Sequence, residues 1–132
     1  MDRFERLASA LRRIPGLEVR ENEPMKRHTT FRIGGPARLM ALPRSRKEAA
    51  AAVRAATEAG IAPFFLGNGS NLLVADHGYE GFVLKACGLD QVREVNRRLR
   101  AESGITLARL ANAALGRGLT GLEFAHGIPG TL

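Results

Sequence analysis

The sequence predicts one domain that mixes helices and strands, and three observations lead to this fold class. The chain has 132 residues, of which 45% are hydrophobic, so it has the length of one domain and can bury its own core. Segments with helical spacing alternate along the chain with short extended segments. Between residues 38 and 66 the expected order is strand, helix, strand, which is the pattern of a βαβ unit.

The first third of the chain predicts a helix followed by extended segments. Apolar residues at helical spacing and a capping pattern of Asp2 with Glu5 predict an amphipathic helix over 2–14. Residues 17–20 alternate like a short strand, which Pro24 interrupts. Residues 28–37 combine a β-branched and aromatic run with a Gly-Gly-Pro break, so we expect strand, sharp turn, strand.

The middle of the chain predicts the βαβ unit. Residues 38–42 are strand-like, and Ser45 with Glu48 forms a capping box before an alanine-rich helix that ends near Gly60. Residues 61–66 form the second strand. A glycine loop then stands at the carboxyl end of that strand, a favoured place for ligands in sheets of this kind.

The last third adds two strands, a helix and a second glycine loop. Residues 81–85 and 92–101 are strand candidates. The second is polar and rich in arginine, so we expect an edge strand or one with a half-solvated face. Residues 106–115 have helical spacing. The segment 121–132 is punctuated by glycines and one proline.

The loop at 67–71 suggests a cradle for phosphate. Glycines allow the backbone to approach a ligand, and successive N–H groups with the Ser70 and Asn71 side chains can converge on anionic oxygens. Asn-Gly between apolar runs is also the strongest short-range signal for a β-hairpin, so a simple turn is the alternative.

Other chemistries find little support in the sequence. The third glycine of a Rossmann fingerprint is replaced by Leu72, and no Gly-Lys-Ser/Thr of a P-loop follows the glycines. Three histidines, His28, His77 and His126, lack metal-ligand spacing, so we expect hydrogen-bonded or surface residues and no metal. Ser70 lacks a nucleophile elbow. The single Cys87 is expected to act as a small hydrophobe.

Composition sets expectations for compartment and partners. No apolar run approaches the roughly 20 residues of a membrane span, and the N-terminus does not resemble a signal peptide, so we expect a cytoplasmic protein without a membrane partner. The net charge of +7 raises the alternative of a basic module for RNA or another polyanion. The arginines are dispersed among acidic residues and aromatic residues are few, which favours a solvated surface and no nucleic-acid partner.

Three motifs together resemble the UDP-N-acetylenolpyruvoylglucosamine reductase family, flavoenzymes of peptidoglycan precursor synthesis. The motifs are HTTFRIGGPA at 28–37, LGNGSNLLVAD at 66–76, and GLEF at 121–124 with GIPGT at 127–131. They occur in the family's order and spacing, and the likeness runs from about residue 22 to the end. A division of the chain into a lead-in, 1–21, and a truncated FAD-binding domain, 22–132, follows from this resemblance.

The resemblance implies an α+β fold, the FAD-binding fold of vanillyl-alcohol oxidases and p-cresol methylhydroxylase, here incomplete. Two subdomains of this fold hold non-covalent FAD between them. The FAD diphosphate would contact the first loop, and the second loop would complete the site; the expected cofactor-binding residues are Gly67, Asn68, Gly69, Ser70, Asn71, Gly127, Ile128, Pro129, Gly130 and Thr131. Residues 32–35 would have a structural role.

The resemblance also implies where the chemistry is missing. In the family, the arginine, serine and glutamate that handle the substrate follow the second loop, so we expect no catalytic residue here and an inactive chain. Family members usually carry a small residue at the position of His126. NADPH as reductant and a UDP-sugar as substrate belong to the full-length enzyme. The alternative enzyme is another flavoprotein of this fold, such as a sugar or alcohol oxidase.

Overall fold

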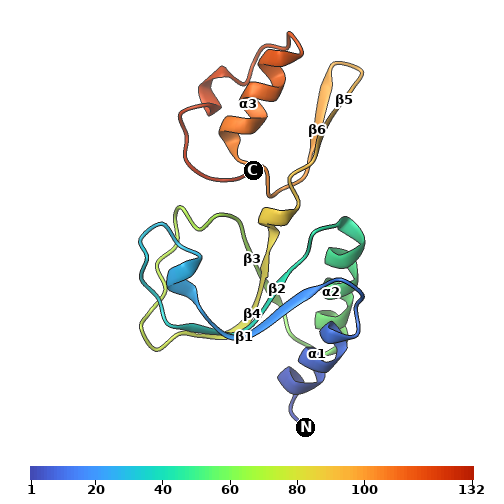
Figure 1. Cartoon of the computed structure of the whole chain (residues 1–132), viewed down its shortest axis with the longest axis vertical. Helices are drawn as coiled ribbons and strands as arrows, with labels where there is room; N and C mark the ends of the chain where they lie inside the picture. Colours follow the sequence, from blue (N-terminus) through green and yellow to red (C-terminus); the bar gives the residue numbers. More distant parts are fainter.

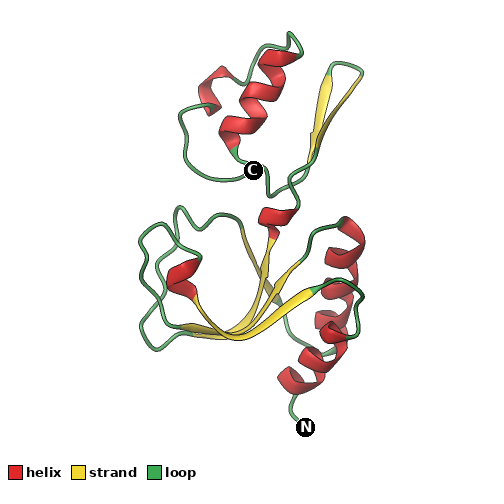
Figure 2. Ribbon diagram, viewed as in Figure 1, coloured by secondary structure: helices red, strands yellow, loops and turns green.

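A computed structural model describes all 132 residues and shows a mixed sheet, two helices on one of its faces, and a smaller body beyond the sheet (Figures 1 and 2). The α-helices are α1 (Arg3–Arg12), α2 (Arg46–Glu58) and α3 (Leu107–Gly116). The strands are β1 (Glu18–Pro24), β2 (Pro36–Leu42), β3 (Pro63–Leu66), β4 (Tyr79–Lys85), β5 (Val92–Val95) and β6 (Arg98–Ala101). The chain also contains three short 3-10 helices, η1 (Met25–Arg27), η2 (Ala86–Gly88) and η3 (Glu123–Ala125).

The main sheet has the strand order β1-β2-β4-β3. β1 pairs with β2 in the antiparallel sense, whereas β4 is parallel to both of its neighbours, β2 and β3. The predicted strand, helix, strand unit is therefore present as β2-α2-β3, but β4 lies between its two strands. The carboxyl ends of β3 and β4 lie next to each other at one edge of the sheet.

The helices α1 and α2 cover one face of the sheet (Figure 1). Asp2 and Glu5 form the full capping box predicted for α1. The Ser45 hydroxyl accepts a hydrogen bond from the Glu48 amide at the start of α2, as predicted, while the Glu48 carboxylate accepts from the Ser45 hydroxyl and the amide of Arg44. The core under these helices is a cluster of eleven buried residues: Phe4, Leu7, Ala8, Leu11, Leu39, Ala41, Ala52, Ala56, Ile61, Phe82 and Leu84. Alternation along β2 and β4 sends every second side chain into it.

The opposite face of the sheet carries a second, smaller core. Its buried members are Met25, Ala37, Met40, Leu66 and Val83. They are covered by η1 and by the long segment 67–78, which contributes half-buried apolar side chains at Leu72 and Val74. The segment that contains the first glycine loop is therefore held down by hydrophobic contact, because it forms the roof of this core.

The smaller body contains the hairpin β5–β6, α3 and the C-terminal segment (Figure 1). The Thr106 hydroxyl caps α3 by accepting from the Arg109 amide. The chain end returns to this cap, since the Leu107 amide donates to the Gly130 carbonyl at 3.1 Å and the Leu132 amide donates to the Ile105 carbonyl at 3.0 Å. No helix in the molecule combines the length and apolar character that crossing a bilayer demands.

Three extended segments differ from the sequence prediction. β1 does not stop short of Pro24 but includes it, which is possible because β1 is an edge strand of the sheet. Residues 92–101 are not one strand but a hairpin, which turns at Asn96 and Arg97 with φ of 50° and 63°. Residues 28–33 are not a strand, because they turn away from the sheet after η1 and β2 begins only at Pro36. Their backbone instead contacts the segment 67–78.

Candidate ligand site between two glycine loops

The first glycine loop opens a crossover connection, not a hairpin. It leaves β3 after Leu66 and the chain enters β4 at Tyr79, and these two strands are parallel. A two-residue hairpin joins only antiparallel strands, so the hairpin alternative is wrong. Within the loop, Gly69 has a φ of +70°, and the Asn68 side-chain oxygen accepts from the Ser70 amide at 3.3 Å. The loop thus has a defined shape at the carboxyl edge of the sheet.

Residues 28–30 form the wall behind this loop. The Thr30 amide donates to the Gly69 carbonyl at 3.1 Å. A β-carbon at Gly69 would overlap the carbonyl oxygen of His28 and come within 2.9 Å of the Thr29 α-carbon. Glycine is required here both for its positive φ and for this close approach of two backbones.

The far end of the crossover is tied by the same N-terminal segment. The Gly35 amide donates to the Ala75 carbonyl at 2.9 Å, and a β-carbon at Gly35 would overlap backbone atoms of Asp76 and Gly78. The segment 28–35 therefore fastens both ends of 67–78. This is the structural work that the Gly-Gly pair does, and it accounts for the absence of a strand over 28–33.

The two glycine loops meet in space. The Thr131 hydroxyl lies where a β-carbon of Gly67 would be, and a β-carbon at Gly130, which has a φ of +123°, would stand 3.0 Å from the Ser70 hydroxyl. Four of the residues expected to bind a ligand thus come together from distant parts of the chain. Asn68 and the buried Gly69 complete the first loop beside them. The remaining four, Asn71, Gly127, Ile128 and Pro129, are exposed on the outer parts of the loops.

A row of hydrogen-bonded charged groups lies behind the wall, and sequence reasoning missed most of it. The Lys85 Nζ lies 2.7 Å from the His28 Nδ1, and the His28 Nε2 lies 3.0 Å from a Glu23 oxygen. Arg20 donates to the same oxygen at 2.9 Å. His28 was expected only to be hydrogen-bonded, whereas Glu23 and Lys85 were not singled out. Burial along β1 does not alternate, and Asn22 has a positive φ just before the buried Glu23, so no local signal marked Glu23.

Electrostatics keep the Glu23 carboxylate charged in this environment. Burial alone would raise the pKa of the Glu23 carboxyl, but hydrogen bonds from His28 and Arg20 and the Arg20 charge outweigh burial and lower this pKa below its ordinary value. The side chains of Glu23 and His28 retain only 8% and 6% of their exposure. Two buried titratable groups are thus paired with each other and with two cations.

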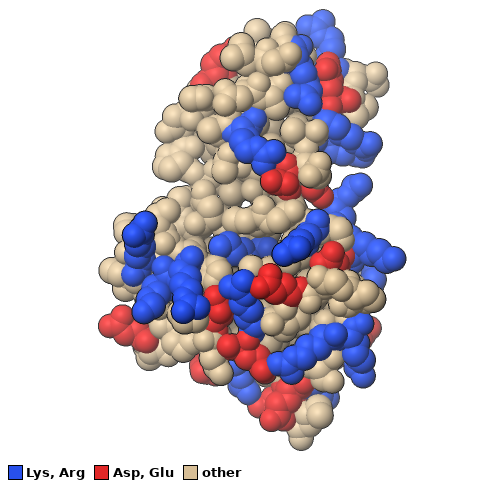
Figure 3. Space-filling model, in the orientation of Figure 1, with Lys and Arg blue, Asp and Glu red and all other residues tan.

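An open basic hollow of about 740 Å³ adjoins the first loop. It is lined by Lys26, Arg27, His28, Thr29, Thr30, Arg32, Asn68, Lys85 and Cys87. Lysine and arginine side chains gather over this part of the molecule on the face that Figure 3 presents, to the left of the sheet. No carboxylate lines the hollow, so it can attract an anion.

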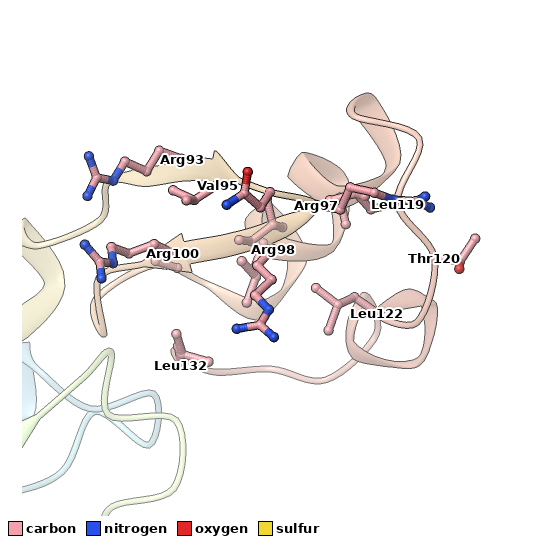
Figure 4. A pocket seen from close by; sticks show the side chains of 14 residues that line it. Arg93, Val95, Arg97, Arg98, Arg100, Leu119, Thr120, Leu122 and Leu132 are labelled. Carbon is pink, nitrogen blue, oxygen red and sulfur yellow. The ribbon is translucent and has the colours of Figure 1, made fainter.

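Another hollow, of about 1050 Å³, lies in the smaller body (Figure 4). It lies between the hairpin β5–β6, α3 and the C-terminal segment. Arg93 and Arg100 face each other across the hairpin, and Leu122 and Leu132 border it from the C-terminal side. Its lining has no Asp, Glu, His or Cys side chain, and its one side-chain hydroxyl, on Thr120, has no such side chain beside it in the lining to act as a base, so the hollow offers mainly binding surface.

Comparison with known proteins gives one family match and a consistent set of relatives. The family described as FAD binding domain matches residues 37–132. The UDP-N-acetylenolpyruvoylglucosamine reductase of Caldanaerobacter subterraneus subsp. tengcongensis is 50% identical over 111 residues, which are 84% of this chain and 37% of that protein. The enzyme of the same name from Moorella thermoacetica is 46% identical over 126 residues, 96% of this chain and 42% of its own length. The chain spans about two fifths of these curated relatives.

Solved structures agree with these relatives. The UDP-N-acetylenolpyruvylglucosamine reductase (MurB) of Thermus caldophilus superposes with a TM-score of 0.64 at 33% identity, over 86% of this chain and 38% of that chain. p-Cresol methylhydroxylase with bound substrate superposes with a TM-score of 0.63 at 11% identity, over 89% of this chain and 25% of its own. The second likeness shows the fold alone. Together they confirm the predicted α+β fold of the vanillyl-alcohol oxidase and p-cresol methylhydroxylase type, present in part.

Proposed function

This chain belongs to the FAD binding domain family, and from that premise we propose that it is the N-terminal, FAD-binding part of a UDP-N-acetylenolpyruvoylglucosamine reductase. The observation that carries the proposal is the meeting of the two glycine loops, Gly67 with Thr131 and Ser70 with Gly130. Relatives at 46% and 50% identity that carry this enzyme's name support it.

The residues at the meeting point fit a diphosphate. A β-carbon at Gly67 would overlap the Thr131 hydroxyl, and one at Gly69 would overlap the His28 carbonyl, so glycine lets the first loop pack closely against both neighbours. Backbone N–H groups and the small hydroxyls of Ser70 and Thr131 are suitable donors to phosphate oxygens. We therefore propose that FAD is held by residues 67–71 and 127–131. Bound FAD supplies the hydride chemistry, and this chain's residues bind and orient it.

The rest of the activity is proposed for the full-length enzyme. NADPH would serve as reductant and UDP-N-acetylenolpyruvoylglucosamine as substrate, giving UDP-N-acetylmuramate for the cell wall, and hence serving cell shape and division, in the cytoplasm. We assign no catalytic role to any residue of the two loops. We propose that it binds FAD and has no reductase activity by itself.

We also propose that residues 22–132 are the FAD-binding unit and 1–21 a lead-in. The division falls within β1, whose residues pair with β2 on both sides of it. The lead-in contributes Phe4, Leu7 and Leu11 to the main core. Removing 1–21 should therefore expose that core, so the unit is best assayed with its lead-in attached.

Flavin retention tests the proposal. The chain is mixed with FAD and passed over a gel-filtration column, and absorbance near the flavin maximum is followed with the protein peak. Co-elution of flavin at a fixed ratio, with a rise in melting temperature as FAD is added, is the expected result. A protein peak free of flavin and a melting temperature unchanged by FAD would overturn the proposal.

An activity assay tests the proposal that the chain alone has no reductase activity. NADPH oxidation is recorded with UDP-N-acetylenolpyruvoylglucosamine, FAD and the 132-residue chain. We expect no turnover above the rate of free flavin. Robust turnover would contradict this claim and would place the missing acid within the chain.

The alternative of a sugar or alcohol oxidase has fold-level support only. Glucooligosaccharide oxidase from Acremonium strictum superposes with a TM-score of 0.63, but at 20% identity. The reductase from Thermus caldophilus reaches a similar TM-score at 33% identity. We therefore prefer the reductase.

A further inference from the structure

We propose that Lys85 is a phosphate-binding residue of the FAD site, and that the buried pair His28 and Glu23 is there to position it. The inference rests on the proposed function and adds to it a cation that neither glycine loop contains. It starts from the row of charged groups behind the first loop.

The position of Lys85 at the sheet edge places it beside the first loop. Lys85 is the last residue of β4 and pairs in register with Leu66, the last residue of β3. Gly67 follows Leu66 directly, so the lysine and the loop start from neighbouring points of the same edge. Lys85 and Asn68 line the same basic hollow.

The ammonium group of Lys85 is fixed by a hydrogen bond of defined direction. An ammonium group only donates, so at 2.7 Å the His28 Nδ1 must accept from it. The ring proton is then on Nε2, which donates to Glu23 at 3.0 Å. Arg20 donates to the same carboxylate oxygen. Both ring nitrogens of His28 are thereby used, one to accept from Lys85 and the other to donate to Glu23.

One residue links the lysine to the glycine loop. The His28 side chain accepts from Lys85, while its backbone carbonyl lies against Gly69, where a β-carbon would overlap it. The cation and the loop backbone are thus fixed relative to each other through His28. This is the arrangement expected of a preorganised anion site, in which the donors are in place before the ligand arrives.

Lys85 still has the capacity to bind an anion. Of its three N–H donors one is used by His28, and no carboxylate lines the hollow to neutralise its charge. The other cations of the hollow, Lys26, Arg27 and Arg32, are exposed, and mobile exposed charges contribute little to a specific contact. Lys85 is the one that the structure holds in place.

Comparison of two flavins tests the assignment. Riboflavin shares the ring of FAD but has no phosphate. For Lys85→Gln we expect FAD affinity to fall about tenfold to a hundredfold, as for the loss of one hydrogen bond to a charged group. Riboflavin affinity should stay the same, because a general loss of structure would weaken both ligands. Lys47→Gln, an equal charge change at an exposed position of α2, should leave both affinities unchanged.

Variants at His28 test the positioning role. His28→Asn keeps an acceptor near the place of Nδ1 and should retain most of the FAD affinity. His28→Leu removes it and should reproduce the selective loss seen in Lys85→Gln. Equal FAD affinity in both variants would overturn the role of His28.

The outcomes separate this inference from the proposed function. A wild-type chain that binds no FAD overturns both. FAD binding that is equal in wild type and Lys85→Gln overturns the assignment of Lys85 alone. Loss of oligouridylate binding in parallel with loss of FAD binding would make the hollow a general polyanion site and also overturn it.

A measurement on the wild type keeps the inference testable if Lys85→Gln does not fold. Cys87 is the only thiol and lines the same hollow as Lys85. FAD should slow the alkylation of Cys87 by iodoacetamide, and riboflavin should not. Equal alkylation rates with and without FAD, at FAD concentrations that saturate the protein, would contradict the assignment.

Discussion

The hydroxyl of Thr131 occupies the space in which Gly67 would carry a side chain. The two residues lie in different bodies of the molecule, and the end of the chain reaches Gly67 because it is hydrogen-bonded to the start of α3. The predicted ligand site therefore depends on a contact between parts that are far apart in sequence. This relationship leads to the first of four predictions.

Gly67→Ala should separate the two loops. The new methyl group would overlap Thr131, so we expect FAD affinity to fall at least tenfold while the main sheet stays folded. Gly116→Ala is the matched control, because a β-carbon there meets nothing within 4 Å. It should keep FAD binding and gain up to about 1 kcal/mol of stability, since alanine is the better helix former. Equal FAD affinity in both variants, measured by fluorescence titration, would argue against contact between the loops.

Gly69→Ala should destabilise the chain more than Gly60→Ala. Both glycines have a φ of +70°, so both substitutions carry the same backbone strain of about 1–2 kcal/mol. Only at Gly69 would the methyl group also overlap the wall, at the His28 carbonyl, because nothing lies within 4 Å at Gly60. We expect an additional loss of about 1–3 kcal/mol for Gly69→Ala. Urea unfolding gives both values, and equal losses would mean that the wall is not in contact with the loop.

Glu23→Gln should reduce the dependence of the free energy of unfolding on pH at acidic pH. The pKa of the Glu23 carboxyl in the folded state lies below its ordinary value of 4.5. The contribution of this carboxylate to the free energy of unfolding is therefore fully present above pH 4.5. This stabilisation is lost as the pH falls below 4.5 and then through the lower pKa of the folded state. Wild-type stability should therefore fall more steeply than that of Glu23→Gln in this range. Glu58→Gln, at an exposed residue of α2, should follow the wild-type curve when unfolding is measured by circular dichroism.

Phe82→Ala should remove much of the main core. Phe82 is fully buried on β4 beneath the two helices. Loss of its ring should cost about 3–5 kcal/mol, the range for buried phenylalanines. Leu115→Ala changes a side chain that is 77% exposed and should cost less than about 0.5 kcal/mol. The free energy of unfolding in urea compares the two, and similar losses would contradict the packing of β4.

Local signals were sufficient for the helices and for the loops. The caps at Asp2 and Ser45 and the apolar spacing of all three helices are short-range features, so they can be recognised in the sequence. Glycine spacing marked both loops for the same reason. The strands β2, β3 and β4 were also found, because each is a short apolar run between turn residues.

The strand order and two turns could not be read from local patterns. Insertion of β4 between β2 and β3 is a matter of long-range pairing, on which the segment 79–85 gives no local information. The hairpin at Asn96 and Arg97 was missed because arginine rarely adopts a positive φ, so the pair does not resemble a turn. Residues 28–33 have strand-forming side chains, but tertiary contacts with 67–78 determine their backbone.

The glycine loops of the candidate site could be predicted from the sequence, but the charged row behind them could not. The resemblance assigned Gly67 and Thr131 to one cofactor site, but it did not indicate that the two residues touch. The row from Glu23 to Lys85 brings together residues of β1 and β4 with His28, which follows η1, and no spacing in the sequence connects them. The hydrogen bonds of the buried Glu23 carboxylate with His28 and Arg20 are apparent only in the folded structure.

The place of β4 in the sheet has a consequence for how the chain assembles during synthesis. A nascent chain that has reached Leu66 already contains β1, β2 and β3, but β3 has no neighbour to pair with, because its only partner, β4, has not yet been made. The sheet can therefore close only when residues 79–85 have left the ribosome. Until then the glycine loop has no fixed ends, and the ligand site is completed later still, when residues 130 and 131 reach Ser70 and Gly67.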